Sequence, residues 1–379
     1  MKNVIFFTNI ASHYRSLLWL YLLKSNKFKI DINFGDPGKT GIKEINFKDE
    51  SFTNLNDNIH RGKNFWLNKK IIIWQSNVFF KCLFGKLDVA IFTSDMYCLS
   101  TWIGALICRF RKIQIVFWGH GIYGNESKFK LFLRVLFYRL ANKHLLYEKR
   151  GKSLMIENGF EPDKLFVIYN SLDYDSHLQL RVLVKSSIKS SVFSFFSIPT
   201  LPVLVFIGRL TPQKKLSLLI DAFFRINDET PICNLLIIGD GPEKAELLTK
   251  SKNGIDAKLI YFTGSIYDEK RIAELLYHSD ICVSPGNVGL TAIHSLSLGT
   301  PVASHNNFFN QMPEVESIIE GYNGFLFPEN DVNTMAIKIT EWLSTKLNRN
   351  IVRNRCYEII DKFYNPKYQL KIIEKCLSK

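Results

Sequence analysis

The stretch from Ser284 to Ser304, SPGNVGLTAIHSLSLGTPVAS, constrains the fold of this chain more than any other segment. It predicts a buried strand ending at Ser284, a tight loop at 286–289, a helix from about Leu290 to Leu298 and a second buried strand at 301–304. Strand, helix and strand in this order form part of a parallel α/β sheet. A helix that begins after a glycine loop offers free N–H groups and a positive dipole end, so the pattern indicates an anion site.

Two further strand-and-turn patterns precede this stretch. One apolar run leads into GRLTPQK at 208–214, and another leads into GDGP at 239–242. The Arg209 guanidinium can bind two phosphate oxygens at once, the Lys214 ammonium adds a point charge, and a helix start adds N–H donors. Together these groups suit a diphosphate. The strands predicted in this region lie at 203–207, 234–238 and 259–262.

In their order and spacing, the three motifs resemble those of the family 4 retaining glycosyltransferases (glycosyltransferase group 1) of bacterial surface-polysaccharide type. The resemblance is strongest from about Val203 to Trp342. It implies an α/β chain of the GT-B fold, in which two Rossmann-like doubly wound domains face a central cleft. The domains expected are an N-terminal Rossmann-like acceptor domain at 1–178, a linker at 179–202, a C-terminal Rossmann-like nucleotide-sugar domain at 203–357 and a C-terminal helix at 358–379 that crosses back to the N-terminal domain.

The resemblance also implies site residues. Arg209 and Lys214 would hold the donor diphosphate, and His120, which lies between two glycines after a predicted strand, would contact the donor sugar. Because glycine neighbours leave a histidine little to pack against, we favour this role for His120 over a structural one. The donor-binding residues implied are Gly208, Ile266, Gly286, Asn287, Gly289, Leu290, Thr291 and His294.

Two of these positions depart from the family pattern. Relatives usually carry a pair of glutamates eight residues apart, and this chain has Gly286 and His294 in their places. A histidine ring nitrogen can donate to or accept from a ribose hydroxyl. We therefore hypothesise that His294 binds the ribose of the donor, the alternative being that His294 packs in a polar pocket of its helix.

The loop after the first predicted strand, Val4–Phe7, carries His13, Tyr14 and Arg15 where many relatives have glycines. These side chains could meet an acceptor hydroxyl or a phosphate, and we expect them to bind the acceptor. Packing of Tyr14 and solvation of Arg15 is the alternative.

Positive charge is concentrated in the first part of the chain. The formal net charge is +14, and residues 1–150 contain 24 Lys and Arg against 10 Asp and Glu, whereas the remainder contains 25 of each. A basic domain without a recognisable nucleic-acid module favours an anionic membrane surface as partner, and no nucleic acid. Aromatic residues and lysines mix at 64–86 and in the predicted helix 128–143, which suits either a membrane interface or buried helices with solvated lysines.

No metal or other cofactor is expected beside the donor substrate. The seven cysteines show no metal-binding spacing and no disulfide pattern, which fits a reducing cytoplasm. Asp173 and Asp175 form a DxD triplet that can hold a metal in other enzymes, but here it falls where relatives leave the first domain, so we interpret it as structural. No apolar run is long enough to span a bilayer. The expected location is therefore cytoplasmic and peripheral, on the inner face of the cytoplasmic membrane.

The sequence thus predicts a metal-independent glycosyltransferase. It would move a sugar from a nucleoside diphosphate donor to a hydroxyl of a glycan, which we expect to be polyprenyl-linked, in O-antigen or capsule synthesis. The missing glutamates support an alternative, a catalytically silent relative that binds partners in a polysaccharide assembly complex. A nucleotide-sugar epimerase is a weaker alternative, because no additional acid and base pair can be assigned.

Overall fold

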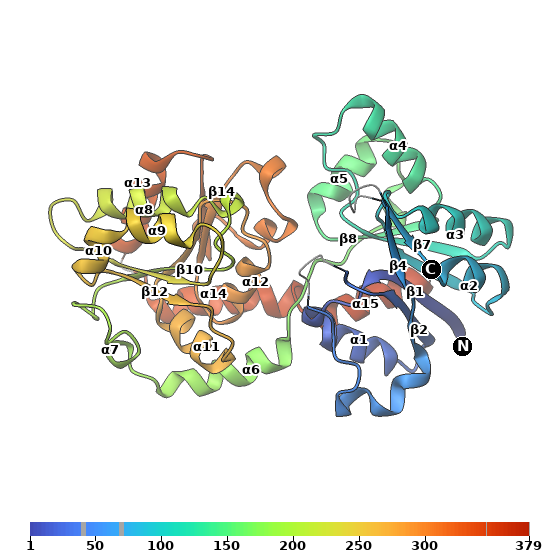
Figure 1. Cartoon of the computed structure of the whole chain (residues 1–379), viewed down its shortest axis with the longest axis horizontal. Coiled ribbons are helices and arrows are strands. Elements are labelled where there is room, and N and C mark those ends of the chain that lie inside the picture. Colours follow the sequence, from blue (N-terminus) through green and yellow to red (C-terminus); the bar gives the residue numbers. More distant parts are fainter. Residues whose placement is uncertain (39–42, 68–71, 346, 379) are drawn as a thin grey trace. The chain divides into compact units, whose positions relative to one another are not determined.

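The computed structural model describes residues 1–38, 43–67, 72–345 and 347–378. Its contacts divide the chain into two compact units (Figure 1). Unit 1 comprises Met1–Asp173 together with the C-terminal segment from Asn365, and unit 2 comprises Tyr174–Tyr364.

Unit 1 is built on a parallel sheet whose described strands follow the order β3-β2-β1-β6-β7-β8-β9. Its central strands are continuous apolar runs because helices cover both faces of the sheet. The strands are β1 Lys2–Ile10, β2 Phe28–Gly35, β3 Ile59–Arg61, β6 Val89–Thr93, β7 Gln114–Gly119, β8 Lys143–Leu146 and β9 Leu165–Val167, and a separate antiparallel pair is formed by β4 Asn64–Leu67 and β5 Ile72–Gln75.

The helices of unit 1 come from both ends of the chain. They are α1 Ser16–Leu23, α2 Val78–Phe84, α3 Leu99–Phe110, α4 Lys128–Tyr138, α5 Lys149–Glu157 and α15 Pro366–Ser378. Helix α15 packs on α1, β8 and β9, where it buries Ile373 and Leu377. The Gln369 side chain accepts from the Ser171 hydroxyl at 2.5 Å and donates to the Tyr169 carbonyl at 2.9 Å. The last helix is therefore an integral part of unit 1.

Unit 2 repeats this architecture with the described strand order β12-β11-β10-β13-β14-β15, again parallel throughout. The strands are β10 Val203–Ile207, β11 Asn234–Ile238, β12 Ile260–Gly264, β13 Ile281–Ser284, β14 Val302–His305 and β15 Gly324–Phe327. The helices are α6 Tyr174–Leu183, α7 Lys189–Val192, α8 Leu216–Ile226, α9 Lys244–Lys250, α10 Lys252–Asp256, α11 Glu269–His278, α12 Leu290–Ser297, α13 Val332–Ser344 and α14 Arg349–Phe363. The two Rossmann-like sheets expected from the sequence are thereby confirmed.

The predicted linker at 179–202 is wrong. This segment contains the end of α6 and the whole of α7, and it belongs to unit 2. The serine-rich composition suggested an irregular connection, but Phe193 and Phe196 are buried and anchor the segment. The units divide after Asp173 and after Tyr364, whereas the boundaries expected from the sequence lie at 178 and 357.

Other predictions in the first half also need correction. Residues 64–86 form no single helix, because β4 and β5 pair before α2 begins; residues 68–71 lie outside the described residues. The segment expected to be a helix at 128–143 ends at Tyr138, since the Asn142 backbone N–H and side-chain oxygen pair with Ile115 and lead the chain into β8. Among the described residues, no helix is both long and apolar enough to cross a membrane.

Candidate functional site

Two glycine turns meet at the carboxyl ends of β10 and β11. A side chain at Gly239 would place its Cβ 1.9 Å from the Gly208 carbonyl oxygen, and one at Gly241 would lie 2.2 Å from the Leu210 carbonyl oxygen. Only glycine permits backbones to approach this closely. The contact leaves the Arg209 side chain exposed at the end of β10.

A cavity of about 360 Å³ lies at this edge of the sheet, over the ends of β10, β11 and β12. It falls within the range of about 300–1,000 Å³ typical of small-molecule sites, and the carboxyl edge is where parallel sheets bind ligands. Gly208, Arg209 and Ile266, all predicted donor residues, line it together with Ser265.

Lys214 ends a short 3-10 turn at 212–214, and its side chain is turned toward the loop before α12. Its Nζ donates to the Asn287 carbonyl oxygen at 2.6 Å and to the Asn287 Oδ1 at 2.9 Å. Burial lowers the pKa of Lys214, while the buried carboxylate of Glu314 opposes that shift. The next residue, Lys215, has φ 52°, which explains why relatives favour glycine there; its ammonium lies 2.5 Å from the Glu329 carboxylate.

Gly286 is closed in by the same turn. Its N–H donates to the Lys214 carbonyl oxygen at 3.0 Å, and a Cβ at this position would lie 2.0 Å from the Gln213 carbonyl oxygen and 2.7 Å from the Lys214 Cα. The backbone of 213–214 therefore occupies the place where any side chain would begin. The packing of the 212–215 turn against the 286–289 loop therefore leaves no space for a glutamate side chain at this position.

Helix α12 begins without a capping side chain. Gly289, at φ 55°, precedes its first residue, Leu290. The loop is held by Gln311, which accepts from the Val288 N–H at 3.0 Å, and Thr291 ties the helix to β10 by donating to the Ile207 carbonyl oxygen at 3.0 Å. A helix start without a side-chain cap can donate its N–H groups to an anion.

His294 lies one turn further along α12 and belongs to a cluster that was not predicted from the sequence. Its Nε2 is 3.6 Å from the Glu269 carboxylate at the start of α11, and its ring stacks on His177 of α6 at 5.3 Å between centroids. Desolvation lowers the pKa of His177 to about 3, and the contact with His294 lowers the pKa of Glu269. No local pattern could have indicated this cluster, because the three residues come from distant segments.

In unit 1, His120 follows β7 and packs more closely than its glycine neighbours suggested. Its ring lies 5.0 Å from that of Tyr147 and 5.5 Å from that of Tyr123. Burial, with the nearby Arg15 and Arg134 charges, lowers the pKa of His120 to about 4. Its Nδ1 is buried and makes no hydrogen bond within the described residues.

Of the three predicted acceptor residues, Arg15 is the one brought close to His120. Arg15 donates to the Tyr147 hydroxyl at 2.6 Å and its guanidinium lies 4.7 Å from the Trp118 ring centre. His13 instead faces the carbonyl oxygen of Lys43, and Tyr14 lies beside it. Tyr147, which contacts both Arg15 and His120, was not predicted.

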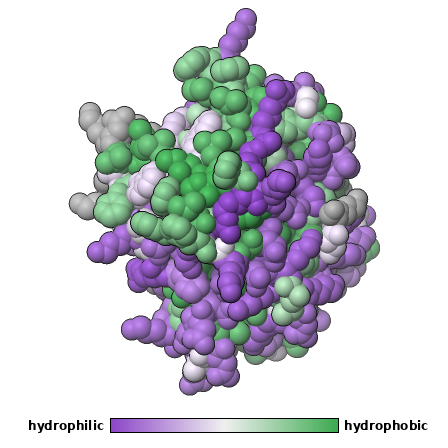
Figure 2. Space-filling model, turned by 90° about the vertical axis from the view of Figure 1, so that its right-hand side faces the viewer, coloured by the Kyte–Doolittle hydropathy of each residue, from purple (hydrophilic) through white to green (hydrophobic). Residues whose placement is uncertain are grey.

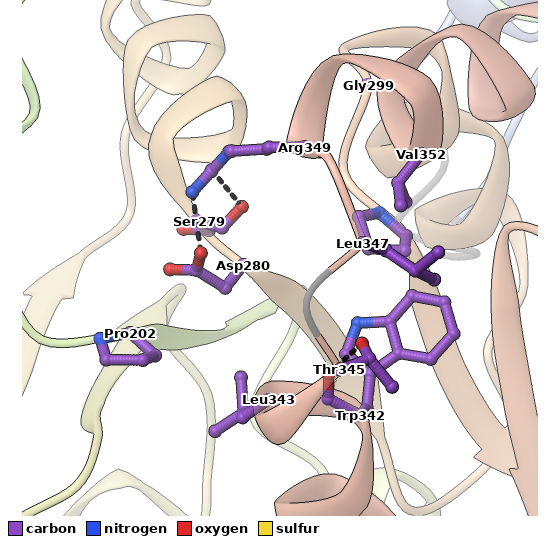
Figure 3. Close-up of a pocket in the computed structure, with 11 residues that line it drawn as sticks. Pro202, Ser279, Asp280, Gly299, Trp342, Leu343, Thr345, Leu347, Arg349 and Val352 are labelled. Atoms are coloured by element: carbon purple, nitrogen blue, oxygen red, sulfur yellow. Dashed lines mark hydrogen bonds and ion pairs between the residues drawn. The ribbon is translucent and has the colours of Figure 1, made fainter.

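A second cavity in unit 2 lies at the opposite, amino-terminal edge of the sheet (Figure 3). It encloses about 100 Å³ beside Pro202, Gly299 and Trp342. There Arg349 donates to the Asp280 carboxylate at 2.6 Å and to two backbone carbonyl oxygens. Since these groups satisfy one another, the contacts hold the base of the sheet together and we assign them a structural role.

Comparisons with known proteins agree with this geometry. Residues 201–345 match the family model described as "Glycosyl transferases group 1". The sulfoquinovosyl transferase SQD2 of Arabidopsis thaliana is 29% identical over 170 residues, 44% of this chain and 31% of that protein. A GDP-mannose-dependent alpha-(1-6)-phosphatidylinositol dimannoside mannosyltransferase of Mycobacterium tuberculosis is 39% identical over 106 residues, 27% of each chain. The chain thus spans less than a third of the length of these relatives.

A solved structure extends the likeness to the whole fold. Anabaena HepE in complex with UDP superposes with a TM-score of 0.70 over 100% of both chains at 17% identity. At that identity the likeness concerns the fold alone. The match at 201–345 covers the strands and loops that carry Arg209, Lys214 and the start of α12, so this segment is similar to group 1 glycosyltransferases, and the chain as a whole has a GT-B fold.

Proposed function

We propose that the protein is a glycosyltransferase that takes a sugar from a nucleoside diphosphate donor and transfers it to a hydroxyl of an acceptor. The observation that carries the proposal is the interlocked pair of loops in which Lys214 and Gly286 meet, directly before the uncapped start of α12. A lysine and a helix start beside an exposed arginine provide charge and N–H donors for a diphosphate.

In the proposed mechanism these groups stabilise the departing diphosphate. Arg209 supplies a bidentate donor, Lys214 a charge held in place by Asn287, and α12 its first N–H groups. Preorganised donors of this kind contribute strongly to catalysis, because they need no reorganisation as charge develops. We assign His120 to the transferred sugar and Arg15 to the acceptor. Transfer proceeds with retention and without a metal on the diphosphate.

We further propose that the acceptor is a lipid-linked glycan and that the protein works at the inner face of the cytoplasmic membrane in surface-polysaccharide synthesis. The mycobacterial relative has a phosphatidylinositol dimannoside in its name, and residues 1–150 carry the excess of positive charge. Helices α2, α3 and α4 also expose large apolar side chains: Phe80, Phe84, Leu106, Phe110, Phe129 and Phe132.

Calorimetric titration of the purified protein with UDP, GDP and dTDP tests the donor site, with Arg209→Ala for comparison. Binding of one nucleotide that this substitution weakens by about 1.5–3 kcal/mol, the contribution of a hydrogen bond to a charged group, is the expected result. Lys252→Ala, which removes an exposed lysine at the start of α10, serves as a matched cation control and should bind like the wild type.

A catalytically silent, partner-binding protein is the second candidate. The packing around Gly286, which leaves no room for the glutamate of relatives, favours it. Absence of binding to all three nucleotides in a protein with a native circular dichroism spectrum would support this candidate and contradict the transferase proposal.

A further inference from the structure

The cluster of His177, Glu269 and His294 in unit 2 has the composition of a metal site. One ligand atom from each of the three side chains lies within 4.8 Å of the other two. Imidazole nitrogens with one carboxylate are a common ligand set for Zn²⁺ and related first-row ions. The residues come from α6, α11 and α12, three helices that lie close together in Figure 1.

The two histidines of the cluster are shielded from solvent, and one of their ring nitrogens makes no hydrogen bond within the described residues. His177 is 6% exposed, and that His294 nitrogen, Nε2, is a buried atom with the Glu269 carboxylate 3.6 Å away. A buried polar atom without a hydrogen bond costs free energy. An ion bound to this nitrogen would satisfy it.

The spacing is compatible with a tetrahedral ion after small side-chain movements. Bonds of about 2.0–2.1 Å place the ligand atoms of a tetrahedral Zn²⁺ roughly 3.4 Å apart. The distance between His294 and Glu269 is already 3.6 Å. Glu269 can adjust its position toward both histidines, because its side chain is 60% exposed and lies in the first turn of α11.

The surrounding charges leave the position open to a cation. The nearest cation on α6, Arg181, is bound to the Asp361 carboxylate at 2.8 Å and to the Ser297 carbonyl oxygen at 2.7 Å.

We propose that His177, Glu269 and His294 bind a single divalent transition-metal ion of the zinc class, with the fourth position open to water. The ion joins the start of α11 to the middle of α12. Three protein ligands and one open position are typical of accessible zinc sites. A metal at this cluster differs from the expectation that the chain binds none, and it assigns the His294 Nε2 to the ion and not to the donor ribose.

Titration of the metal-free full-length chain with Zn²⁺, and with Co²⁺ as a visible-light probe, tests the proposal. We expect one ion per chain, a Co²⁺ absorption band of a tetrahedral site, and a thermal midpoint that rises when Zn²⁺ is added. Glu269→Gln and His294→Gln should each weaken Zn²⁺ binding at least about tenfold and abolish the Co²⁺ band.

Glu246→Gln is the matched control, because Glu246 is likewise an exposed carboxylate in the first turn of a helix of unit 2. It should bind Zn²⁺ like the wild type. Since Glu269 is exposed, its replacement should leave the fold intact, as circular dichroism can verify. Equal Zn²⁺ affinity in Glu269→Gln and Glu246→Gln, or no stoichiometric binding by the wild type, would overturn the proposal whether or not the protein binds nucleotides.

Discussion

Lys214 donates two hydrogen bonds from its Nζ to Asn287, one to the backbone carbonyl oxygen at 2.6 Å and one to the side-chain Oδ1 at 2.9 Å. The same ammonium thus positions the loop before α12 and forms part of the proposed diphosphate site. Substituting Lys214 and substituting Asn287 should separate its role in the loop from its role at the diphosphate.

Lys214→Ala should lower the affinity for the donor nucleotide by about 1.5–3 kcal/mol, because it removes a charged donor. Asn287→Ala should cost less, about 0.5–1.5 kcal/mol, because Lys214 keeps its charge and its bond to the backbone. Calorimetric titration with the nucleotide that binds the wild type provides both values. If Asn287→Ala proved the more damaging of the two, Lys214 would be acting through the loop and not through the diphosphate.

Gly286→Ala should lower the free energy of unfolding of unit 2, and added nucleotide should not restore the lost stability. A Cβ would lie 2.0 Å from the Gln213 carbonyl oxygen, so the 212–215 turn would have to move. We expect a loss of about 1–3 kcal/mol, the usual cost of overpacking, in the free energy of unfolding by urea. Gly286→Glu, which restores the residue of relatives, should be at least as destabilising.

Gly321→Ala is the control for this experiment. Gly321 has φ 69°, but a Cβ added there would have no neighbouring atom within 4 Å, so alanine meets backbone strain without crowding. Its cost should be about 1 kcal/mol. A smaller loss at Gly286 than at Gly321 would show that the 212–215 turn yields easily and that a glutamate could be accommodated at Gly286 after all.

Most of unit 2 could be predicted from the sequence because its determinants are local. The strands β10 and β11 coincide with the predicted apolar runs, and the glycine turns after them mark the ends of buried strands. The helices α6 and α7 were not predicted, because the serine-rich composition of this region indicated an irregular connection. Two phenylalanines just after α7, Phe193 and Phe196, are nevertheless buried. The Glu269 and His177 contacts to His294, and the role of Tyr147 beside His120, arise from tertiary packing that no sequence period records.

Acidification should destabilise the protein through its buried histidines. Desolvation lowers the pKa of His144 to about 3 in the folded protein, against about 6.5 in an unfolded chain. Between these values the unfolded state binds more protons, so the contribution of His144 is present above pH 6.5 and is lost as the pH falls toward 3. At pH 5.5 this loss should reach about 1 kcal/mol relative to pH 7.

Urea unfolding at pH 7 and pH 5.5 measures this effect. The variant His144→Phe should show a smaller decrease in stability between the two pH values than the wild type does. His13→Gln replaces an exposed histidine and should retain the full decrease. Identical decreases in His144→Phe and His13→Gln would mean that other groups cause the acid sensitivity.

An exposed apolar face on unit 1 predicts where the protein would meet a membrane. A buried helix was one of the two expectations for the segment 128–143, but Phe129 and Phe132 of α4 are exposed. The buried side of the helix carries Phe137, Tyr138 and Arg134, which pairs with Glu126 at 2.9 Å. Figure 2 shows hydrophobic residues gathered on the upper part of this face. Phe110, at the end of α3, is 91% exposed.

Basic side chains accompany these rings. Arg109, Lys112, Lys128 and Lys130 lie on or next to α3 and α4, and all four are exposed. Aromatic residues beside cations favour the interface of an anionic bilayer, where each cation near the surface contributes about 1 kcal/mol and each ring adds its buried apolar area. Apolar and electrostatic contributions should therefore both be measurable.

Sedimentation with vesicles containing an anionic phospholipid tests this face. Phe110→Ser combined with Phe129→Ser should weaken vesicle binding at least about tenfold, since each phenylalanine contributes about 1.5–3 kcal/mol when fully buried. Wild-type binding should also weaken as salt is raised from about 0.1 to about 0.5 M, because the Debye length shortens from about 10 Å. Ile337→Ser, which removes an exposed apolar residue of α13 in unit 2, should bind like the wild type. Equal binding by the double variant and by Ile337→Ser would exclude the α3–α4 face as the membrane contact, and the charge of unit 1 would then need another explanation.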